Sequence, residues 1–193
     1  MEPPFVKRPQ LISLYAPVMQ SGKSEVAEVL CEQHGFVLVK FADPVKDMTR
    51  SFLRMAGAPE ALCERMLEGD LKEQVIPGLG KSTRHLLQTL GTDWGRDRVS
   101  ANVWVNLTVD RLRHYLRAGR SVVIDDMRFP NELEAVLAMG GVPVKIIRRG
   151  VPRYNAHPSE GLLDNYPMAT TDNSGTLGDL RYTASILPQL LEE

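Results

Sequence analysis

Short apolar runs alternate along the chain with stretches in which apolar residues recur at helical spacing. Continuous apolar runs of this length predict strands that are buried on both faces, and the intervening stretches predict the helices that cover them. We therefore expect an α/β fold with a parallel sheet flanked by helices. The expected strands are 11–15, 36–41, 121–124, 142–147 and a brief one at 169–172, and the expected helices begin near Val26, Asp43, Leu86, Trp104, Pro130 and Leu177.

Glycine and proline mark where these elements end. Gly91 and Gly119 are expected helix ends, and Asp43 is expected to cap a helix with Pro44 at its first position. Two charged segments rich in glycine and proline interrupt the order and predict a surface insertion and an exposed lid. The predicted organisation is a single domain, 1–193, with its core at 11–56, 82–148 and 169–193, the insertion at about 57–81 and the lid at about 149–168.

The charge balance narrows the range of partners. The 193 residues include 23 basic and 24 acidic side chains, so the chain lacks the excess of positive charge that holds long nucleic acid or an anionic membrane surface. No apolar run approaches the ~18 residues of a membrane span. Two cysteines cannot build a disulfide framework or a zinc site. We expect a cytoplasmic protein whose partners include neither membrane nor long nucleic acid.

The tripeptide Gly22-Lys23-Ser24 stands where the first strand gives way to a helix. Backbone N–H groups and the positive helix end can surround a phosphate chain there. Lys23 would reach the β- and γ-phosphates of ATP, and the Ser24 hydroxyl would bind Mg²⁺. A complete motif has glycine five positions before Gly22, where this chain has Pro17, and the effect of that proline stays open. The predicted ATP-binding residues are Val18, Gln20, Ser21, Gly22, Lys23, Ser24 and Glu25.

A second Gly-Lys-Ser occurs at residues 80–82. Little apolar sequence precedes it, and position 75 is again not glycine. We expect an ordinary loop there, with Ser82 or Thr83 capping the helix that follows.

Three longer motifs occur in a fixed order, namely Phe41-Ala-Asp-Pro-Val-Lys46, Leu86-Leu-Gln-Thr-Leu-Gly-Thr-Asp-Trp-Gly-Arg96 and Asp126-Met-Arg-Phe-Pro-Asn-Glu132. With His157-Pro-Ser-Glu160, they resemble the bacteriophage deoxynucleoside monophosphate kinase family over about residues 11–180. The resemblance implies a three-layer P-loop NTPase fold of the adenylate-kinase type. It also implies ATP as donor with Mg²⁺, a deoxynucleoside 5′-monophosphate as acceptor bound beside the insertion, and the host cytoplasm if the gene is a phage's.

The resemblance assigns roles around the third strand. Asp126 is similar to the metal-side acid that would work with Ser24, and it is also an acceptor-site candidate, with Asp125 as the runner-up for the metal. Arg128 could bridge the donor and acceptor phosphates, because a guanidinium matches phosphate oxygens in pairs. A surface salt bridge to Glu132 or Glu134 is the competing interpretation, and Asn131 and Glu132 are expected to cap the turn.

The remaining candidates divide into acceptor and lid residues. Asp43 and Lys46 follow the second strand, where open α/β sheets bind ligands, although Asp43 could be only a cap. Trp94 could stack on the base or pack in a core. Arginines placed after the fourth strand could close over the transferred group, or could simply be solvated. The acceptor set is Asp43, Lys46, Arg84, Gln88, Trp94, Asp126 and Arg128, the catalytic set is Lys23, Arg128, Arg148 and Arg149, and the lid set adds Arg153 and His157.

Two rival interpretations remain. One is a P-loop kinase for a modified nucleotide or nucleic acid, and the other is an inactive ATP-binding switch, for which Pro17 is the best argument. The number of arginines favours an enzyme. Base preference, selectivity for deoxyribose, a donor other than ATP and a homodimeric state stay open.

Overall fold

The computed structural model describes residues 10–18, 20–150 and 161–191. The chain forms two compact units. The first comprises the described residues up to Lys40 and those from Val109 onward, and the second is Phe41–Thr108. Whether both belong to the one kinase domain expected from the sequence stays a prediction.

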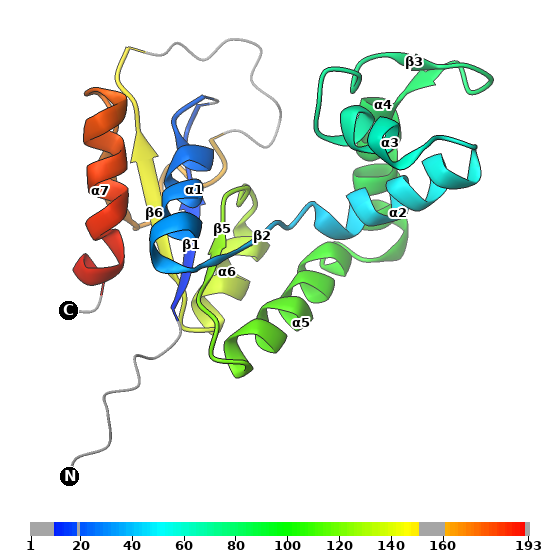
Figure 1. The fold of residues 1–193 in the computed structure, drawn as a ribbon. Helices are drawn as coiled ribbons and strands as arrows, with labels where there is room; N and C mark the ends of the chain where they lie inside the picture. The colour runs from blue at the N-terminus through cyan, green and yellow to red at the C-terminus, as the bar shows by residue number, and fades with distance from the viewer. Residues whose placement is uncertain (1–9, 19, 151–160, 192–193) are drawn as a thin grey trace. The chain divides into compact units, whose positions relative to one another are not determined.

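The first unit is built on a five-stranded sheet in the order β2-β5-β1-β6-β7 (Figure 1). Every neighbouring pair is parallel, which confirms the parallel sheet expected from continuous apolar runs. The second strand is shorter than predicted, because it covers only three residues of the apolar run 36–41. The strands are β1 Leu11–Tyr15, β2 Val37–Val39, β5 Val122–Ile124, β6 Val142–Ile147 and β7 Ala169–Asp172.

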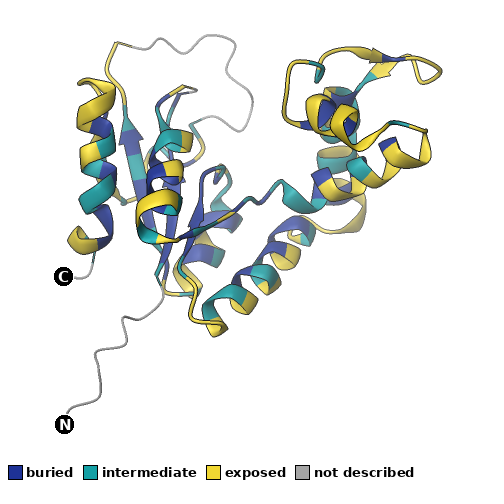
Figure 2. Cartoon of the chain, viewed as in Figure 1, coloured by how far each residue is buried: buried dark blue, intermediate teal, exposed yellow. Residues whose placement is uncertain are grey.

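Helices cover both faces of this sheet. Alternate residues of β1, Ile12 and Leu14, are buried in one cluster with apolar side chains of α1 (Lys23–His34) and α7 (Leu177–Leu190). The opposite face carries Leu11 and Ser13, whose hydroxyl lies 3.2 Å from the Met127 sulfur. The helix α6 (Pro130–Ala138) lies on this second face, and Figure 2 shows the strands between the layers as buried. The three-layer α/β arrangement predicted from the sequence is confirmed.

The second unit has a core of its own. It contains α2 Asp43–Met55, α3 Glu60–Leu67, the two-stranded β3 Val75–Ile76 and β4 Lys81–Ser82, α4 Thr83–Gln88, the π-helix η1 Thr89–Val99 and the start of α5 Val103–Arg117. Leu53 of α2 is buried with Cys63, Met66, Leu67 and Ile76. The segment 57–81 was expected to be a surface insertion without core. Four of its apolar residues, Cys63, Met66, Leu67 and Ile76, are instead buried in one cluster with Leu53 of α2, whereas Leu62, Val75 and Leu79 are exposed.

Two helix ends differ from those predicted. Ala42, not Asp43, stands at the N-cap of α2, and Asp43 is the first helical residue beside Pro44. Gly91 does not end its helix, because the backbone continues through it as the π-helix Thr89–Val99. A tertiary contact explains this difference. The indole N–H of Trp104 donates to the Gly91 carbonyl at 2.7 Å, and the Trp104 ring packs against Gly95.

No helix in the described ranges combines the length and the apolar composition that crossing a bilayer requires.

The packing of Trp104 beneath η1 predicts a specific cost at Gly95. A Cβ at this position would lie 2.3 Å from Trp104 Cζ2, whereas a Cβ at Gly91 would meet only the Val45 methyls at 3.8 Å. We expect Gly95→Ala to lower the free energy of unfolding by about 1–3 kcal/mol through overpacking. Gly91→Ala, the matched control in the same helix, should change it by less than about 1 kcal/mol. Urea unfolding measures both, and equal effects would contradict this packing.

Candidate functional site

The loop between β1 and α1 presents backbone N–H groups at the end of the sheet. Gly22 stands at the N-cap of α1 with φ of 92°, and Lys23 is the first helical residue. The first N–H groups of a helix have no partner within it, and the helix dipole favours an anion beside them. Gln20 also has a positive φ, 57°, in a conformation that side chains rarely adopt. The loop therefore has the backbone of an anion-binding turn.

An asparagine from the far end of the chain braces this loop. Asn173, which follows β7 and is buried, donates its side-chain N–H to the Ser21 carbonyl at 3.0 Å. The Ser21 hydroxyl donates in turn to the Val18 carbonyl at 2.6 Å. A Cβ on Gly22 would lie 2.6 Å from Asn173 Nδ2 and 2.7 Å from Leu180 Cδ2, so the position admits only glycine. The sequence analysis missed Asn173, and a lone asparagine after a brief polar strand offers no signal for it.

A serine and a carboxylate meet behind the loop. The Ser24 hydroxyl donates to Asp125 Oδ2 at 3.3 Å, and the Lys40 ammonium lies 3.5 Å from the same oxygen. Asp125 is 5% exposed, and its Oδ1 has no hydrogen-bond partner among the described residues. A buried carboxylate oxygen and a nearby hydroxyl oxygen are suitable metal ligands for Mg²⁺, which takes oxygen ligands and usually keeps several waters. The residues present therefore fit a magnesium ion.

The segment after Asp125 forms a turn held by Glu132. The Glu132 carboxylate accepts from the backbone N–H of Arg128 at 2.7 Å and from that of Phe129 at 3.0 Å, which confirms that Glu132 caps this turn. Arg128 is exposed, and its guanidinium makes no ion pair within the described part of the chain. The expected alternative, a salt bridge to Glu132, is thus replaced by a backbone contact. Asp126 is half-buried on the same turn.

Two arginines follow β6 at the same end of the sheet. The Arg148 guanidinium donates to the Gln20 carbonyl at 3.0 Å, which brings it to the loop. Arg149 instead turns to the end of β7, where its Nε lies 3.5 Å from Asp172 Oδ2. The hydrogen bond from the Ser174 hydroxyl lowers the pKa of the Asp172 carboxyl. Arg153 and His157 lie outside the described residues.

The acceptor candidates of the second unit fall in two places. Lys46 is buried on the first turn of α2, with its ammonium 2.5 Å from Glu68 Oε1. Arg84 lies in the first turn of α4 and pairs with Glu73. Asp43 is half-buried where α2 begins, and Gln88 is exposed at the end of α4.

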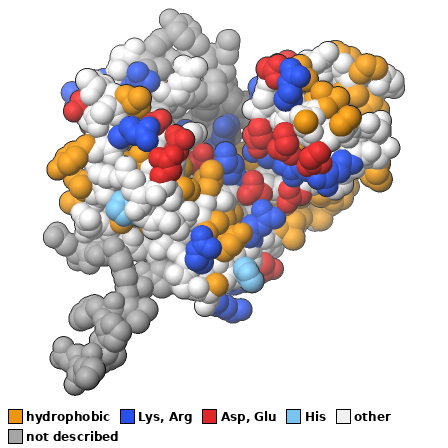
Figure 3. Space-filling view, viewed as in Figure 1, with side chains coloured by type: hydrophobic (Ala, Val, Ile, Leu, Met, Phe, Trp, Pro, Cys, Tyr) orange, Lys and Arg blue, Asp and Glu red, His pale blue; other side chains and the backbone are white. Residues whose placement is uncertain are grey.

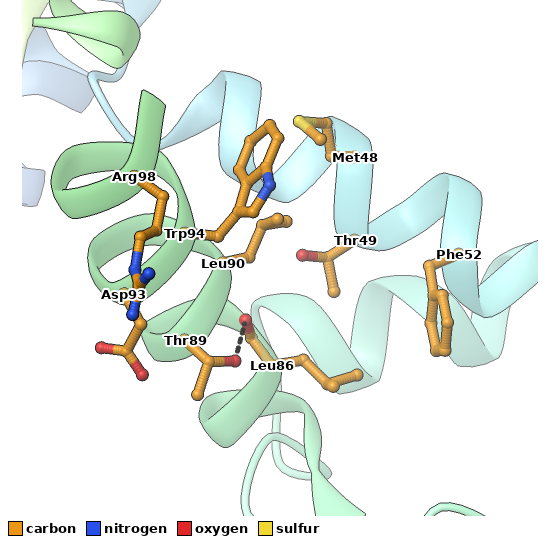
Figure 4. Close-up of a pocket in the computed structure, with 9 residues that line it drawn as sticks. All are labelled: Met48, Thr49, Phe52, Leu86, Thr89, Leu90, Asp93, Trp94 and Arg98. Atoms are coloured by element: carbon orange, nitrogen blue, oxygen red, sulfur yellow. Dashed lines mark hydrogen bonds between the residues drawn. The ribbon is translucent and has the colours of Figure 1, made fainter. Parts of the chain in front are cut away.

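Trp94 lies elsewhere, in an apolar pocket of about 670 Å³ between α2, α4 and η1 (Figure 4). Its indole is 45% exposed, and its ring lies 6.1 Å from that of Trp104. Neither Arg84 nor Gln88 lines this pocket. The lining residues are Met48, Thr49, Phe52, Leu86, Thr89, Leu90, Asp93, Trp94 and Arg98.

A glycine-capped helix after the central strand of a parallel sheet, with serine and aspartate side by side behind it, defines a P-loop phosphate-binding protein. The family model of deoxynucleotide monophosphate kinases matches residues 73–183, more than half of the chain. A protein of Acanthamoeba polyphaga mimivirus, assigned as a deoxynucleotide monophosphate kinase, is 30% identical over 153 residues, which cover 72% of this chain and 75% of the viral protein. The chain belongs to the deoxynucleotide monophosphate kinase family, and it is a kinase.

Solved structures give a looser likeness. A protein from Thermus thermophilus is 20% identical, with a TM-score of 0.49, and covers 95% of this chain and 99% of its own. Dephospho-CoA kinase from Campylobacter jejuni is 14% identical, with a TM-score of 0.44 and coverage of 96% and 98%.

The bond from Asn173 to the loop predicts a loss of nucleotide affinity when the donor is removed. Asn173→Asp places a carboxylate oxygen against the Ser21 carbonyl, so the loop should shift and ATP binding should weaken by about tenfold or more. Asn106→Asp adds the same charge on an exposed turn of α5 and should leave ATP affinity unchanged. Calorimetric titration with MgATP measures both variants. Equal affinities for the folded variants would show that Asn173 does not hold the loop.

Proposed function

We propose that this kinase transfers the γ-phosphoryl group of ATP, with Mg²⁺, to a deoxynucleoside 5′-monophosphate and forms the diphosphate. The observation that carries the proposal is the contact between Ser24 and Asp125 behind a glycine-capped helix. Membership of the family supports the same reaction. The ligand is a small nucleotide, which agrees with a formal net charge of −1.

We propose Asp125, the runner-up in the sequence analysis, as the metal-side carboxylate in place of Asp126. The support is its position, since Asp125 is the carboxylate within hydrogen-bonding distance of Ser24, and its Oδ1 is available to a cation. When bound, a magnesium ion would supply positive charge that offsets the negative charge of the phosphates. Ser24 and Asp125 would hold it, with the Lys40 ammonium 3.5 Å from Asp125 Oδ2.

The transfer itself needs alignment more than covalent help. An oxygen of the acceptor phosphate attacks the γ-phosphorus, the bond to the β–γ bridging oxygen breaks, and ADP leaves. The acceptor phosphate is largely ionised at neutral pH, so no strong base is required. Lys23 on the first turn of α1 and the Arg148 guanidinium at the Gln20 carbonyl would stabilise the charge on the transferring group. Arg128 would bridge the two substrates, as its exposed guanidinium allows.

The second unit would supply the acceptor contacts. We propose Lys46 and Arg84 for the phosphate, Asp43 and Gln88 for polar contacts to the nucleoside, and Trp94 for stacking on the base. The exposed indole of Trp94 at a pocket wall supports stacking. Roles for Asp126, Arg149, Arg153 and His157 stay predictions.

Production of ADP tests the reaction. Purified protein with MgATP is given each deoxy- and ribonucleoside monophosphate in turn, together with the variants Lys23→Ala and Lys81→Ala. We expect one or a few monophosphates to stimulate ADP release. Lys23→Ala should reduce the rate by about 100-fold or more, because the lysine would contact the transferred phosphate. Lys81, the exposed lysine of the second Gly-Lys-Ser, is the matched control and should keep the wild-type rate.

Two results would overturn the proposal. Phosphorylation of an oligonucleotide but of no mononucleotide would favour the rival kinase interpretation. Tight ATP binding without acceptor-dependent turnover would favour the switch.

The adjacent acids provide a second test. Asp125→Asn removes the charged oxygen beside Ser24, so it should lower kcat by about 100-fold or more and raise the Mg²⁺ concentration needed for half-maximal rate. Asp126→Asn, the matched change one residue on, should have a smaller effect and leave the Mg²⁺ dependence in place. Reaction rates measured over a Mg²⁺ titration distinguish the two aspartates. A larger loss for Asp126→Asn than for Asp125→Asn would assign the metal site to Asp126.

A further inference from the structure

Three cationic residues lie on segments that pack together in the second unit. Lys46 lies on α2, Lys72 on the turn after α3, and Arg84 at the start of α4. The backbone N–H of Arg84 donates to the Lys72 carbonyl at 3.0 Å, which fixes the turn against α4. Positive charges are costly to hold side by side without anions between them. An anion bound between these three residues would therefore be stabilising.

Two glutamates partly supply that anion. Glu68 lies 2.5 Å from the Lys46 ammonium, and Glu73 pairs with the Arg84 guanidinium. Lys72 is half-buried and makes no ion pair or hydrogen bond through its ammonium among the described residues. Among the described residues, the ammonium of Lys46 and the guanidinium of Arg84 each have a carboxylate partner, and the Lys72 ammonium has none.

The electrostatics of Lys72 agree with this arrangement. Burial lowers the pKa of its ammonium below the ordinary value, and the positive charges of Lys46 and Arg84 lower it further. Glu68 and Glu73 act in the opposite direction without cancelling these effects. An additional anion at Lys72 would relieve both the burial and the repulsion.

Other charged pairs of this unit do not share the imbalance. Arg54 and Glu60 meet one to one at 2.6 Å, both exposed, and the Arg50 guanidinium lies 2.6 Å from both Asp47 and Glu64. Figure 3 shows basic and acidic side chains side by side on this unit. The cluster of Lys46, Lys72 and Arg84 differs in holding two buried or half-buried lysines with a surplus of charge.

We propose that Lys46, Lys72 and Arg84 form the binding site for the phosphate of the acceptor, and that Glu68 and Glu73 occupy these cations until the phosphate displaces them. The inference deepens the proposed function and rests on it. A phosphate dianion carries three oxygens and nearly two charges, so it can satisfy all three cations, whereas each carboxylate satisfies only one. The cluster thus selects a phosphorylated nucleoside over a free one.

Displacement of the two glutamates by the phosphate is favourable because the glutamates are more exposed than the lysines. The side chains of Glu68 and Glu73 are 47% and 66% exposed, so they can turn into water with little loss. The lysines cannot follow them, since Lys46 has only 11% of its side chain exposed. It follows that the glutamates compete with the phosphate, and that removing one should tighten binding.

Two opposite variants test the site. Each deoxynucleoside 5′-monophosphate and its nucleoside are titrated calorimetrically into wild-type protein and into Lys72→Met and Glu73→Gln. Lys72→Met should weaken monophosphate binding by about tenfold or more, and Glu73→Gln should strengthen it by about two- to fivefold. Binding of nucleosides and of MgATP should not change. The matched controls, Lys81→Met and Glu60→Gln, alter exposed residues of the same unit and should bind like wild type.

Each result has a distinct meaning. If wild-type protein phosphorylates a monophosphate and Lys72→Met binds it equally well, the phosphate site is wrong and the kinase stands. Weaker binding by Glu73→Gln would overturn the competition, because it would make Glu73 a ligand of the acceptor. If no monophosphate binds or is turned over by the wild type, the proposed function fails first and this inference with it. Glu68→Gln tests the same competition at the second glutamate. Because this change removes the carboxylate partner of Lys46, urea unfolding checks that the variant is folded.

Discussion

The parallel pairing of β1 with β5 on one side and β6 on the other is the constraint on which the first unit depends. The carboxyl ends of parallel strands share one edge of a sheet, so residues far apart in the chain arrive together there. The loop after β1, Asp125 after β5, Arg148 after β6 and Asn173 after β7 all meet this condition. The observed contacts follow from it, since Asp125 reaches Ser24 and Arg148 reaches the loop backbone.

The loop between β1 and α1 has a strained backbone that side-chain hydrogen bonds hold in place. Gln20 and Gly22 have positive φ, which isolated chains resist except at glycine. The buried side-chain amide of Asn173 donates a hydrogen bond to the Ser21 carbonyl and holds this shape. Gly22 fits closely against Asn173, with no room for a Cβ. Preorganisation of this kind matters for phosphoryl transfer, because donors already in place need no rearrangement when charge develops. Asp125 Oδ1, a buried oxygen with no hydrogen-bond partner among the described residues, would be ready for the proposed cation in the same way.

Much of the first unit could be predicted from the sequence, because buried parallel strands and the helices between them have strong periodic signals. The site was harder where the deciding contact is tertiary. Asp125 and Asp126 are neighbours with equal local chemistry, and only the register of β5 beside β1 shows which one reaches Ser24. Gly91 looked like a helix end because glycine usually is one. The helix continues because Trp104, thirteen residues on, binds its carbonyl, and no local pattern contains that information.

The two Gly-Lys-Ser tripeptides show why context decides chemistry. Gly22 ends a loop after the central buried strand and begins a helix of twelve residues, so its N–H groups are aimed along a strong dipole at the edge of the sheet. Ser82 instead follows a two-residue strand, and its hydroxyl accepts from the His85 N–H at 3.3 Å, which caps a helix of only six residues. A serine engaged as a cap cannot also bind a metal with the same lone pair. In the acceptor site proposed for the second unit, side-chain cations on several segments would take the place of a backbone loop. The two phosphates of the proposed reaction would then be bound by two different kinds of site.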